Sequence, residues 1–529
     1  MAKDPTNTTP EDGATPTATA TATATKAPTD VSAANGSTDN WDVKRFLSSM
    51  RMDTAGPAPV PMVSNDLQTI DDSISDADRF VSGMAAILMN IDPSAGKFDK
   101  GAVQSLIARI DQLITLQLNA VIHSEQFKAM ESQWLALYDL IQNTNFKADV
   151  VLDILDVSKD ELYMDFDSNS VDITGSALFK KIYIAEYDQY GGQPYASIIG
   201  LYEFYHTPHD EFWLKIMGKI AAASHAPFIG AVSPQFFGCE TMDELAAFKD
   251  VEGLINQPRY GSWNTLRDSE VAAYIGLTLP RYILRLPYDP ETNPAGKLNF
   301  KEEVRGNNSE DYLWGSATML FAKNMIRSFI GSGWCQYLRG PKGGGLVPGL
   351  PVHMFNIRGE EEMKIPVEIT IPDFRELEFA NAGFMPLIYR KNTADACFFS
   401  CQSIKTSKKY KDPKDSENSQ LVTNISYSYS ITRIAHYIKC IMRDNIGSSA
   451  DAAYIEKNLN EWLFQYVTTV VNPDNITLRN YPFKAASVVV KERPGMIGWY
   501  DCAISILPHI QFEGMDVELR LDARLGSAS

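Results

Sequence analysis

The stretch that decides the fold class is residues 197–233, which read SIIGLYEFYHTPHDEFWLKIMGKIAAASHAPFIGAVS. Its first and last parts, SIIGLYEFY and PFIGAVS, are short apolar runs typical of buried strands. The part between them, EFWLKIMGKIAAASHA, has the apolar spacing of a helix. This mixture of strand and helix predicts an α/β or α+β body.

The same alternation extends in both directions, and we expect the mixed body to occupy residues 149–400. The strand-like segments are DVVLDILDV (149–157), KKIYIAEYD (180–188) and YIGLTLPRYILRLP (274–287). The helix-like segments are MDELAAF (242–248) and SATMLFAKNMIRSFIGSG (316–333). A charged stretch, SKDEL, follows the first strand-like segment and is typical of a helix start.

Two further regions precede this body. Residues 66–148 are predicted to be helical, since GAVQSLIARIDQLITLQLNAVIHSE and EQFKAMESQWLALYDLI each carry apolar residues along one face. Residues 1–65 are predicted to form an arm and linker. Its tract TPTATATATATKAPTD has too few apolar residues to fold, and DTAGPAPVPMV suits an extended connector.

The last region, residues 401–529, is predicted to hold two helices and then strands. The helices are SYSITRIAHYIKCIMRD and AAYIEKNLNEWLFQYV. SVVVKE and WYDCAISIL flank RPGMIG, which supplies the glycine and proline of a hairpin turn. MDVELRLDARL (515–525) alternates apolar and charged residues as a half-buried strand does, and another chain can complete such a strand.

Composition narrows the class of protein. The chain has 529 residues and a net charge of −18, which opposes nonspecific binding to nucleic acid or to anionic membranes. Six cysteines do not indicate a disulfide framework in a chain this long, so a reducing cytoplasm is expected. The start, MAKDPTNTTPEDG, lacks the order of a secretory signal, and no apolar run is long enough to span a bilayer.

A glycine-rich loop is the first candidate for chemistry. It lies in GWCQYLRGPKGGGLVPGLPVH (333–353). A phosphate-binding P-loop needs its lysine after the last glycine, but Lys342 precedes Gly343, Gly344 and Gly345. Pro348 opposes the helix that a dinucleotide-binding loop would need. The order of residues favours a structural turn over a nucleotide site.

A second candidate is the histidine pair His206 and His209, followed by Asp210 and Glu211. Their spacing could hold a metal, but no third histidine or CxxC pair accompanies them. Acidic residues in the first turn stabilise a helix N-terminus, so we favour a helix start here.

The remaining candidates also favour structural roles. Cys397 and Cys401 lie among aromatic residues and resemble buried thiols, while His225 and His436 lie in helical patterns. The basic segment KTSKKYKDPK (405–414) is interrupted by aspartate and suits an acidic partner surface better than nucleic acid. With no GxSxG motif either, we expect no enzyme, no catalytic residue, no metal and no cofactor.

Several long stretches, in order from about residue 66 to the C-terminus, resemble one family. It is the large subunit of the contractile sheath of bacterial type VI secretion systems. The stretches include FKAMESQWLALYDLI, WNTLRDSEVAAYIGLTLPRYILRLPYDPETNP, DYLWGSATMLFA, GWCQYLRGPKGGGLVPGLPVH, ITRIAHYIKCIMRDNIG and LPHIQFEGMDVELRL.

The resemblance implies a multi-domain sheath-subunit fold and a structural function. It implies a heterodimer with a small sheath subunit that polymerises with copies of itself into a helical tube on a baseplate. That tube surrounds an inner tube of secreted protein, contraction propels effectors into target cells, and an AAA+ ATPase disassembles the contracted sheath.

The resemblance also implies where neighbouring subunits meet: an N-terminal linker and C-terminal strands, placed here at about residues 487–492 and 500–507, that partner chains complete. The partner-interface residues expected on this basis are Val488, Val490, Tyr500, Ile504, Ile506, Val517 and Leu519. Two alternatives stay open. One is the sheath of another phage-tail-like contractile particle, and the other is a metal- or nucleotide-dependent enzyme centred on His206, His209 and residues 343–345.

Overall fold

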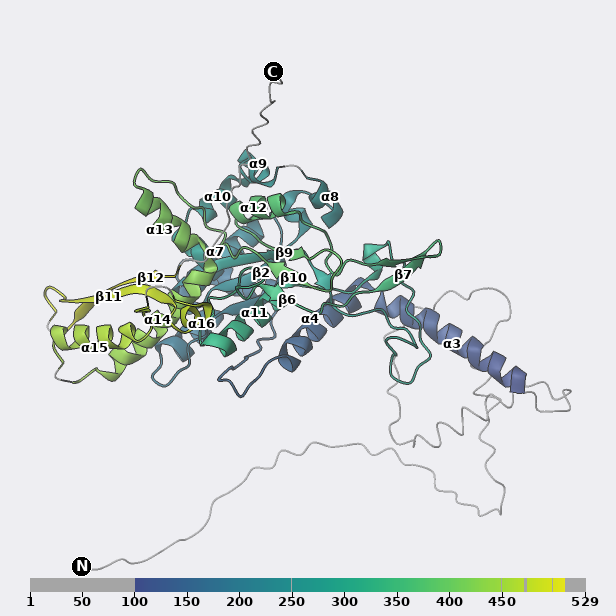
Figure 1. Cartoon of the computed structure of the whole chain (residues 1–529), viewed down its shortest axis with the longest axis horizontal. Helices are drawn as coiled ribbons and strands as arrows, with labels where there is room; N and C mark the ends of the chain where they lie inside the picture. The colour runs from purple at the N-terminus through teal and green to yellow at the C-terminus, as the bar shows by residue number, and fades with distance from the viewer. Residues whose placement is uncertain (1–99, 249, 449, 471–472, 497, 510–529) are drawn as a thin grey trace, which may run out of the picture. The chain divides into compact units, whose positions relative to one another are not determined.

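The computed structural model describes residues 100–509 except 249, 449, 471–472 and 497, and all structural statements below refer to these residues (Figure 1). The chain divides by its internal contacts into residues 1–107 and 108–529. The sheet, its covering helices and the C-terminal hairpin belong to the second unit. The predicted arm and the predicted strand over 515–525 lie outside the described residues.

A six-stranded sheet forms the centre of the 108–529 unit. Its order is β1 (Ile198–Phe204), β2 (Phe228–Val232), β3 (Ile275–Leu279), β9 (Met385–Tyr389), β10 (Ala396–Phe398) and β6 (Leu346–Val347). The first four strands are parallel, and β10 runs antiparallel to both β9 and β6. β2, β3 and β9 are buried along their whole length, as expected of strands covered on both faces.

The two faces of the sheet hold separate cores. Successive side chains of a strand point to opposite faces, so the neighbours Phe228 and Ile229 of β2 enter different clusters. Phe228 packs at 5.3 Å between ring centroids against Trp213 of α7 (Pro208–Ser224). Ile229 packs in the cluster that contains Phe321 of α11 (Ala317–Ser332). The mixed helix and sheet body predicted from the sequence is therefore confirmed.

The other helices surround this body or follow it. The longer ones are α3 (Lys100–Ile122), α4 (Glu125–Gln142), α5 (Lys159–Ser168), α10 (Gly261–Arg267), α12 (Asp373–Asn381), α13 (Pro413–Thr423), α14 (Ile425–Asp444) and α15 (Ala452–Phe464). The short ones are α6 (Ala177–Phe179), α8 (Met242–Ala247), α9 (Val251–Ile255), α16 (Asn475–Asn480) and 3-10 turns at 173–175, 234–237, 258–260, 270–274 and 309–311.

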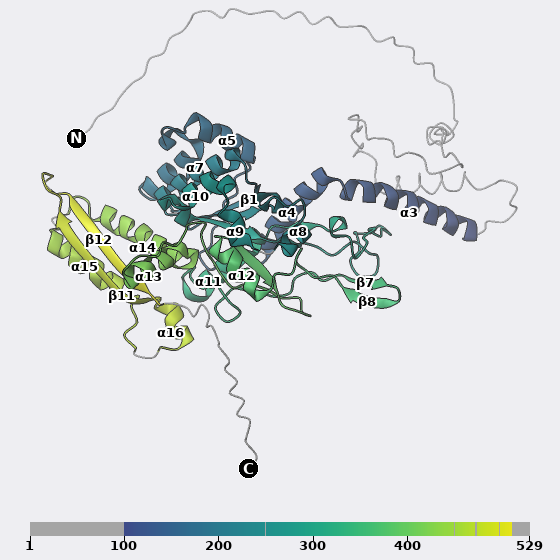
Figure 2. The same cartoon turned by 90° about the horizontal axis from the view of Figure 1, so that it is seen from above.

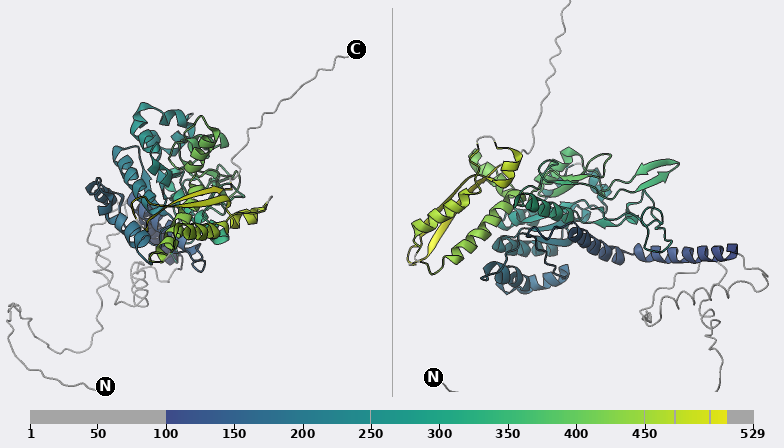
Figure 3. Two further views of the ribbon diagram at one scale, coloured as in Figure 1. Left: turned by 90° about the vertical axis from the view of Figure 1, so that its left-hand side faces the viewer. Right: turned by 60° about the horizontal axis from the view of Figure 1, so that its bottom comes forward.

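Three two-stranded sheets complete the described part of the chain. They are β4 (Tyr282–Ile283) with β5 (Trp314–Gly315), β7 (Met354–Ile357) with β8 (Glu360–Met363), and β11 (Phe483–Glu492) with β12 (Tyr500–Pro508). Figure 3 shows the yellow β11–β12 hairpin lying along the green C-terminal helices.

The predicted helices over 101–125, 125–141, 428–444 and 452–467 are confirmed, and so is the helix start at SKDEL. There Ser158 accepts a hydrogen bond from the Glu161 amide, and the Glu161 carboxylate accepts one from the Ser158 amide. This capping box satisfies two N–H groups that the first turn leaves unpaired. The predicted domain boundaries stay predictions.

Two predicted strands are wrong. Residues 180–188 form a π-helix, η2 (Lys180–Asp188), whose buried Ile182 and Tyr187 lie five residues apart on one face. Residues 149–157 are extended but enter no ladder. Their Val151 and Ile154 side chains are exposed, whereas Val150 and Leu152 pack beside α4 and α11 and Val157 packs against the core that contains Trp213.

Candidate assembly interface

The histidine pair does not form a metal site. His209 stacks on Tyr163 with 3.6 Å between ring centroids, whereas His206 lies 4.1 Å from the Tyr260 ring. The His206 Nε2 is 3.2 Å from Glu211, and burial lowers the pKa of His206. In residues 100–509 as described, no group of three or more His, Cys, Asp or Glu side chains is placed to hold a metal.

The neighbouring carboxylate serves the fold. Asp210 lies in the first turn of α7, where its amide donates to the Thr207 hydroxyl that caps the helix. Its buried carboxylate lies 2.8 Å from Lys159 Nζ and accepts a hydrogen bond from the Tyr205 amide at 2.7 Å. The predicted helix start is confirmed, and the buried ion pair with Lys159 is a partner that sequence spacing did not reveal.

The glycine loop is tied to the end of β10 and to α11. Gly340 donates to the Phe398 carbonyl at 2.7 Å, and the Phe398 amide donates to the Gly345 carbonyl at 3.0 Å. The side chain of Asn324 donates to the same Gly345 carbonyl at 3.1 Å. The loop therefore acts as the structural turn that its sequence favours.

The two cysteines are buried, and His225 and His436 are half-buried. Burial raises the pKa of Cys397 and of Cys401 to about 12 each, so both thiols stay protonated at neutral pH. His436 Nε2 lies 2.9 Å from the Ser224 carbonyl oxygen, and burial lowers its pKa to about 4. The predicted buried environment of these thiols is confirmed.

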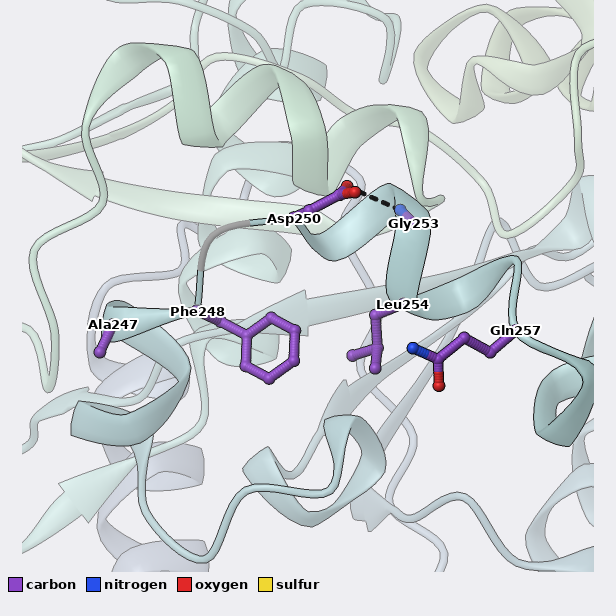
Figure 4. A pocket seen from close by; sticks show the side chains of 6 residues that line it. All are labelled: Ala247, Phe248, Asp250, Gly253, Leu254 and Gln257. Carbon is purple, nitrogen blue, oxygen red and sulfur yellow. Dashed lines mark hydrogen bonds between the residues drawn. The ribbon is translucent and has the colours of Figure 1, made fainter.

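A shallow pocket between α8 and α9 offers no reactive group. Ala247, Phe248 and Leu254 form its apolar part, as Figure 4 shows. Asp250 points away to accept a hydrogen bond from the Gly253 amide at 2.7 Å, which caps α9. The Asp250 carboxylate at this pocket therefore serves as a helix cap.

The β11–β12 hairpin differs from the sheet of the body because it has only two strands. Arg493 donates to the Trp499 carbonyl at 2.8 Å to close the turn, and Gly495 and Gly498 adopt positive φ there. The predicted strands over 487–492 and 500–507 and the turn between them are confirmed.

The outer edge of β11 is closed by side chains of α15. The Val488 amide donates to Asn460 Oδ1 at 3.0 Å, and Asn460 Nδ2 donates to the Val488 carbonyl at 3.0 Å. Glu456 accepts a further hydrogen bond from the Val490 amide at 2.9 Å. The two side chains occupy the place of a third strand.

The outer edge of β12 has no partner strand among the described residues. Val488 and Ile504 are opposite each other in the hairpin. The main-chain N–H and C=O of Val488 point outward to Asn460, so this pair is not hydrogen-bonded across the hairpin. The main-chain N–H and C=O of Ile504 therefore also point outward, on the β12 side. The same holds for Cys502 opposite Val490. No other residue in the described part of the chain pairs with this edge, so its N–H and C=O groups are available to an added strand.

The predicted interface residues divide into two groups. Val488 and Val490 are buried against α15, so their side chains belong to the core of this chain. Tyr500 and Ile506 are partly buried beside them, while Ile504 is 37% exposed on the uncovered half of the hairpin. Val517 and Leu519 lie outside the described residues. Contact of these residues with a partner stays a prediction.

Comparison with known proteins identifies the family. A family model for the VipB tail sheath N-terminal domain (EvpB/VC_A0108) matches residues 104–405, and one for its tail sheath gpW/gp25-like domain matches residues 414–525. The type VI secretion system sheath protein TssC1 of Pseudomonas aeruginosa is 40% identical over 432 residues. That alignment covers 81% of this chain and 86% of TssC1.

Solved structures overlap only weakly with this fold. The baseplate of the anti-feeding prophage gives a TM-score of 0.34 at 11% identity, covering 71% of this chain and 84% of that one. The contracted helical sheath of the same particle gives a TM-score of 0.30 at 12% identity, covering 60% of this chain and 68% of that one. The sequence comparisons carry the assignment: the chain belongs to the EvpB/VC_A0108 tail sheath family.

Proposed function

We propose that this chain is the large structural subunit of a type VI secretion contractile sheath. The observation that supports it in the structure is the open outer edge of β12, in a chain that belongs to a tail sheath family. A strand from another subunit would pair with this edge through main-chain hydrogen bonds, as in other cases of strand addition. The chain would thus be joined to its neighbours by a shared sheet.

The same arrangement suits a lattice that contracts. A main-chain ladder at β12 can hold neighbours together while their bodies rotate, because the hairpin packs on α14 and α15 and outside the six-stranded sheet. We place the small sheath subunit and further copies of this chain as the strand donors. Relaxation of an extended lattice would supply the work, so this subunit would turn over no substrate.

The wider partners follow from the same proposal. The sheath would enclose an inner tube, stand on a baseplate and be taken apart by an AAA+ ATPase, all in the cytoplasm. No helix that the structure describes is long and apolar enough to cross a membrane.

Co-expression with a small sheath subunit tests the proposal. We expect tubules by negative-stain electron microscopy. Ile504→Pro removes one outward N–H while leaving the hydrogen bonds inside the hairpin, so it should give folded chains without tubules. Ile504→Thr keeps the N–H and should assemble. If both wild-type chains are soluble and remain monomeric, the sheath function is wrong.

A further inference from the structure

The basic segment 405–414 lies where the two family-model matches leave a gap, between residues 405 and 414. Two of its lysines are paired within the chain: Lys405 Nζ is 2.7 Å from Glu270, and Lys408 Nζ is 3.8 Å from Asp268. Lys409, Lys411 and Lys414 are exposed, and none has an ion-pair partner in the part of the chain that the structure describes. We call these three residues the lysine connector.

The loop that carries the lysine connector is held in place by main-chain hydrogen bonds to side chains of the same loop and of α13. The Lys408 amide donates to the Ser419 hydroxyl at 2.9 Å, and the Tyr410 amide donates to the Ser416 hydroxyl at 2.8 Å. Asp412 caps α13 by accepting from the Lys414 amide at 2.9 Å. Three positive charges are therefore presented on an anchored loop, where little backbone entropy is lost on binding.

The β7–β8 hairpin carries the opposite charge. Glu360, Glu361 and Glu362 follow one another along β8, all are exposed, and within the described residues none forms an ion pair. A two-residue turn of Arg358 and Gly359, both at positive φ, joins the strands. Successive side chains of a strand point to opposite faces, so Glu360 and Glu362 share one face of this hairpin and Glu361 lies on the other. Two strands alone are marginally stable, so a contact from outside would stabilise this hairpin.

The two charged surfaces lie on opposite sides of the central sheet. Figures 1 and 2 both place α13 on one side of the central sheet and β7–β8 on the other. A contact between them therefore joins two copies. Because it uses two different surfaces, it is heterologous and leaves one surface free at each end, as a helical polymer requires.

We propose that the lysine connector of one copy binds Glu360, Glu361 and Glu362 of a second copy. The unpaired lysines and the unpaired glutamates are opposite in sign, and the lysines outnumber the neighbouring Asp412 and Asp415. The inference rests on the proposed sheath, in which this pairing is a contact of the lattice.

Charge exchange tests the pairing in full-length chains co-expressed with the small sheath subunit. Changing Lys409, Lys411 and Lys414 to Glu should reduce the number of tubules roughly tenfold or more, because like charges then face each other. Changing Glu360, Glu361 and Glu362 to Lys should do the same. Combining both sets restores the pairing with reversed sign and should restore tubules.

A matched control separates this pairing from a general charge effect. Lys180, Lys181 and Lys215 are also exposed, and changing them to Glu alters the net charge by the same amount. This control should assemble normally. If the combined exchange variant does not assemble although both parents are folded by circular dichroism, the lysines bind something other than β8 and the inference is wrong.

Zero-length carbodiimide cross-linking gives an independent reading. In wild-type tubules, mass spectrometry should find a peptide linking Lys409 or Lys411 to residues 360–362, and dissociated chains should not yield it. Tubules without this link would overturn the inference while leaving the sheath function standing. Absence of wild-type tubules would instead contradict the sheath function itself, so the two failures are distinguishable.

Discussion

At Gly344 the main chain has a φ of +101°, and a Cβ atom there would lie 2.1 Å from the Tyr337 carbonyl oxygen. Both the dihedral angle and the backbone contact exclude a side chain. We predict that Gly344→Val lowers the free energy of unfolding by roughly 3 kcal/mol or prevents folding. Urea denaturation followed by circular dichroism measures this.

Gly331→Val is the matched control for that substitution. Gly331 lies in α11, and a Cβ there would have open space around it. Valine is a better helix residue than glycine, so stability should stay within about 0.5 kcal/mol or increase. If Gly344→Val were equally neutral, the turn at residues 343–345 would not be needed for the fold.

His436 predicts a pH dependence of stability. Burial lowers its pKa from 6.5 to about 4, with His225, Arg433 and Lys439 acting in the same direction. The unfolded chain therefore binds a proton between pH 6.5 and pH 4 that the folded chain does not. The contribution of His436 to the free energy of unfolding is fully present above pH 6.5 and is lost as the pH falls. The free energy of unfolding should therefore decrease by about 2 kcal/mol between pH 7 and pH 5.

His436→Gln tests this contribution. Glutamine can still donate to the Ser224 carbonyl but does not titrate in this range. The difference in unfolding free energy between pH 7 and pH 5 should be about 2 kcal/mol smaller in the variant than in the wild type. An equal difference in both proteins would mean that His436 is not buried in its neutral form.

Among the elements, α15 has a second role besides filling the core, because it closes the edge of β11. Asn460→Ala would leave the buried N–H and C=O of Val488 without partners. We predict a loss of roughly 2 kcal/mol in the free energy of unfolding. The opened edge should also make the variant aggregate at lower concentration, which light scattering measures.

Lys457→Ala serves as the control on the same helix. Lys457 is exposed and forms only a surface ion pair with Glu461 at 3.8 Å. Its removal should change stability by less than about 0.5 kcal/mol and leave aggregation unchanged. If Asn460→Ala behaved like Lys457→Ala, the hydrogen bonds of Asn460 to β11 would not contribute to the free energy of unfolding.

The sequence predicted those elements whose pattern is complete within a short window. The strands on either side of α7 and the C-terminal hairpin have apolar residues in the period of their own backbone. Residues 180–188 misled because Ile182 and Ile184 alternate as in a strand, whereas the residues that are buried are Ile182 and Tyr187, which lie on one face of the π-helix. Residues 149–157 have strand composition but find no neighbouring strand to pair with.

The candidate site was predictable in position and not in detail. The glycine and proline of RPGMIG between two strand-like runs located the hairpin. Asn460 and Glu456 lie about 30 residues earlier on α15, and nothing local shows that they pair with Val488 and Val490. Ile504 was among the residues expected at the partner contact, whereas Cys502, whose main-chain groups also point outward, was not.

On the scale of the whole molecule, the described hydrophobic cores begin only with the helix α4. The four core clusters of the described residues run from Ala136 to Ile506, and the sequence of residues 1–65 predicts an arm and linker with few apolar residues to bury. The fold and the proposed linkage between subunits should therefore be separable by deletion.

Deletion of residues 2–65 is expected to leave a folded chain that does not form tubules with the small sheath subunit. Thermal unfolding should be within a few degrees of wild type, because no described core contact is lost. Assembly should fail, because an arm that links neighbours is removed.

Deletion of residues 2–40 alone is the control. It removes the Thr/Ala tract, keeps the segment with Trp41 and the proline-rich linker, and should assemble. Normal tubules from the longer deletion would show that the linkage lies elsewhere, with the edge of β12 as the remaining candidate.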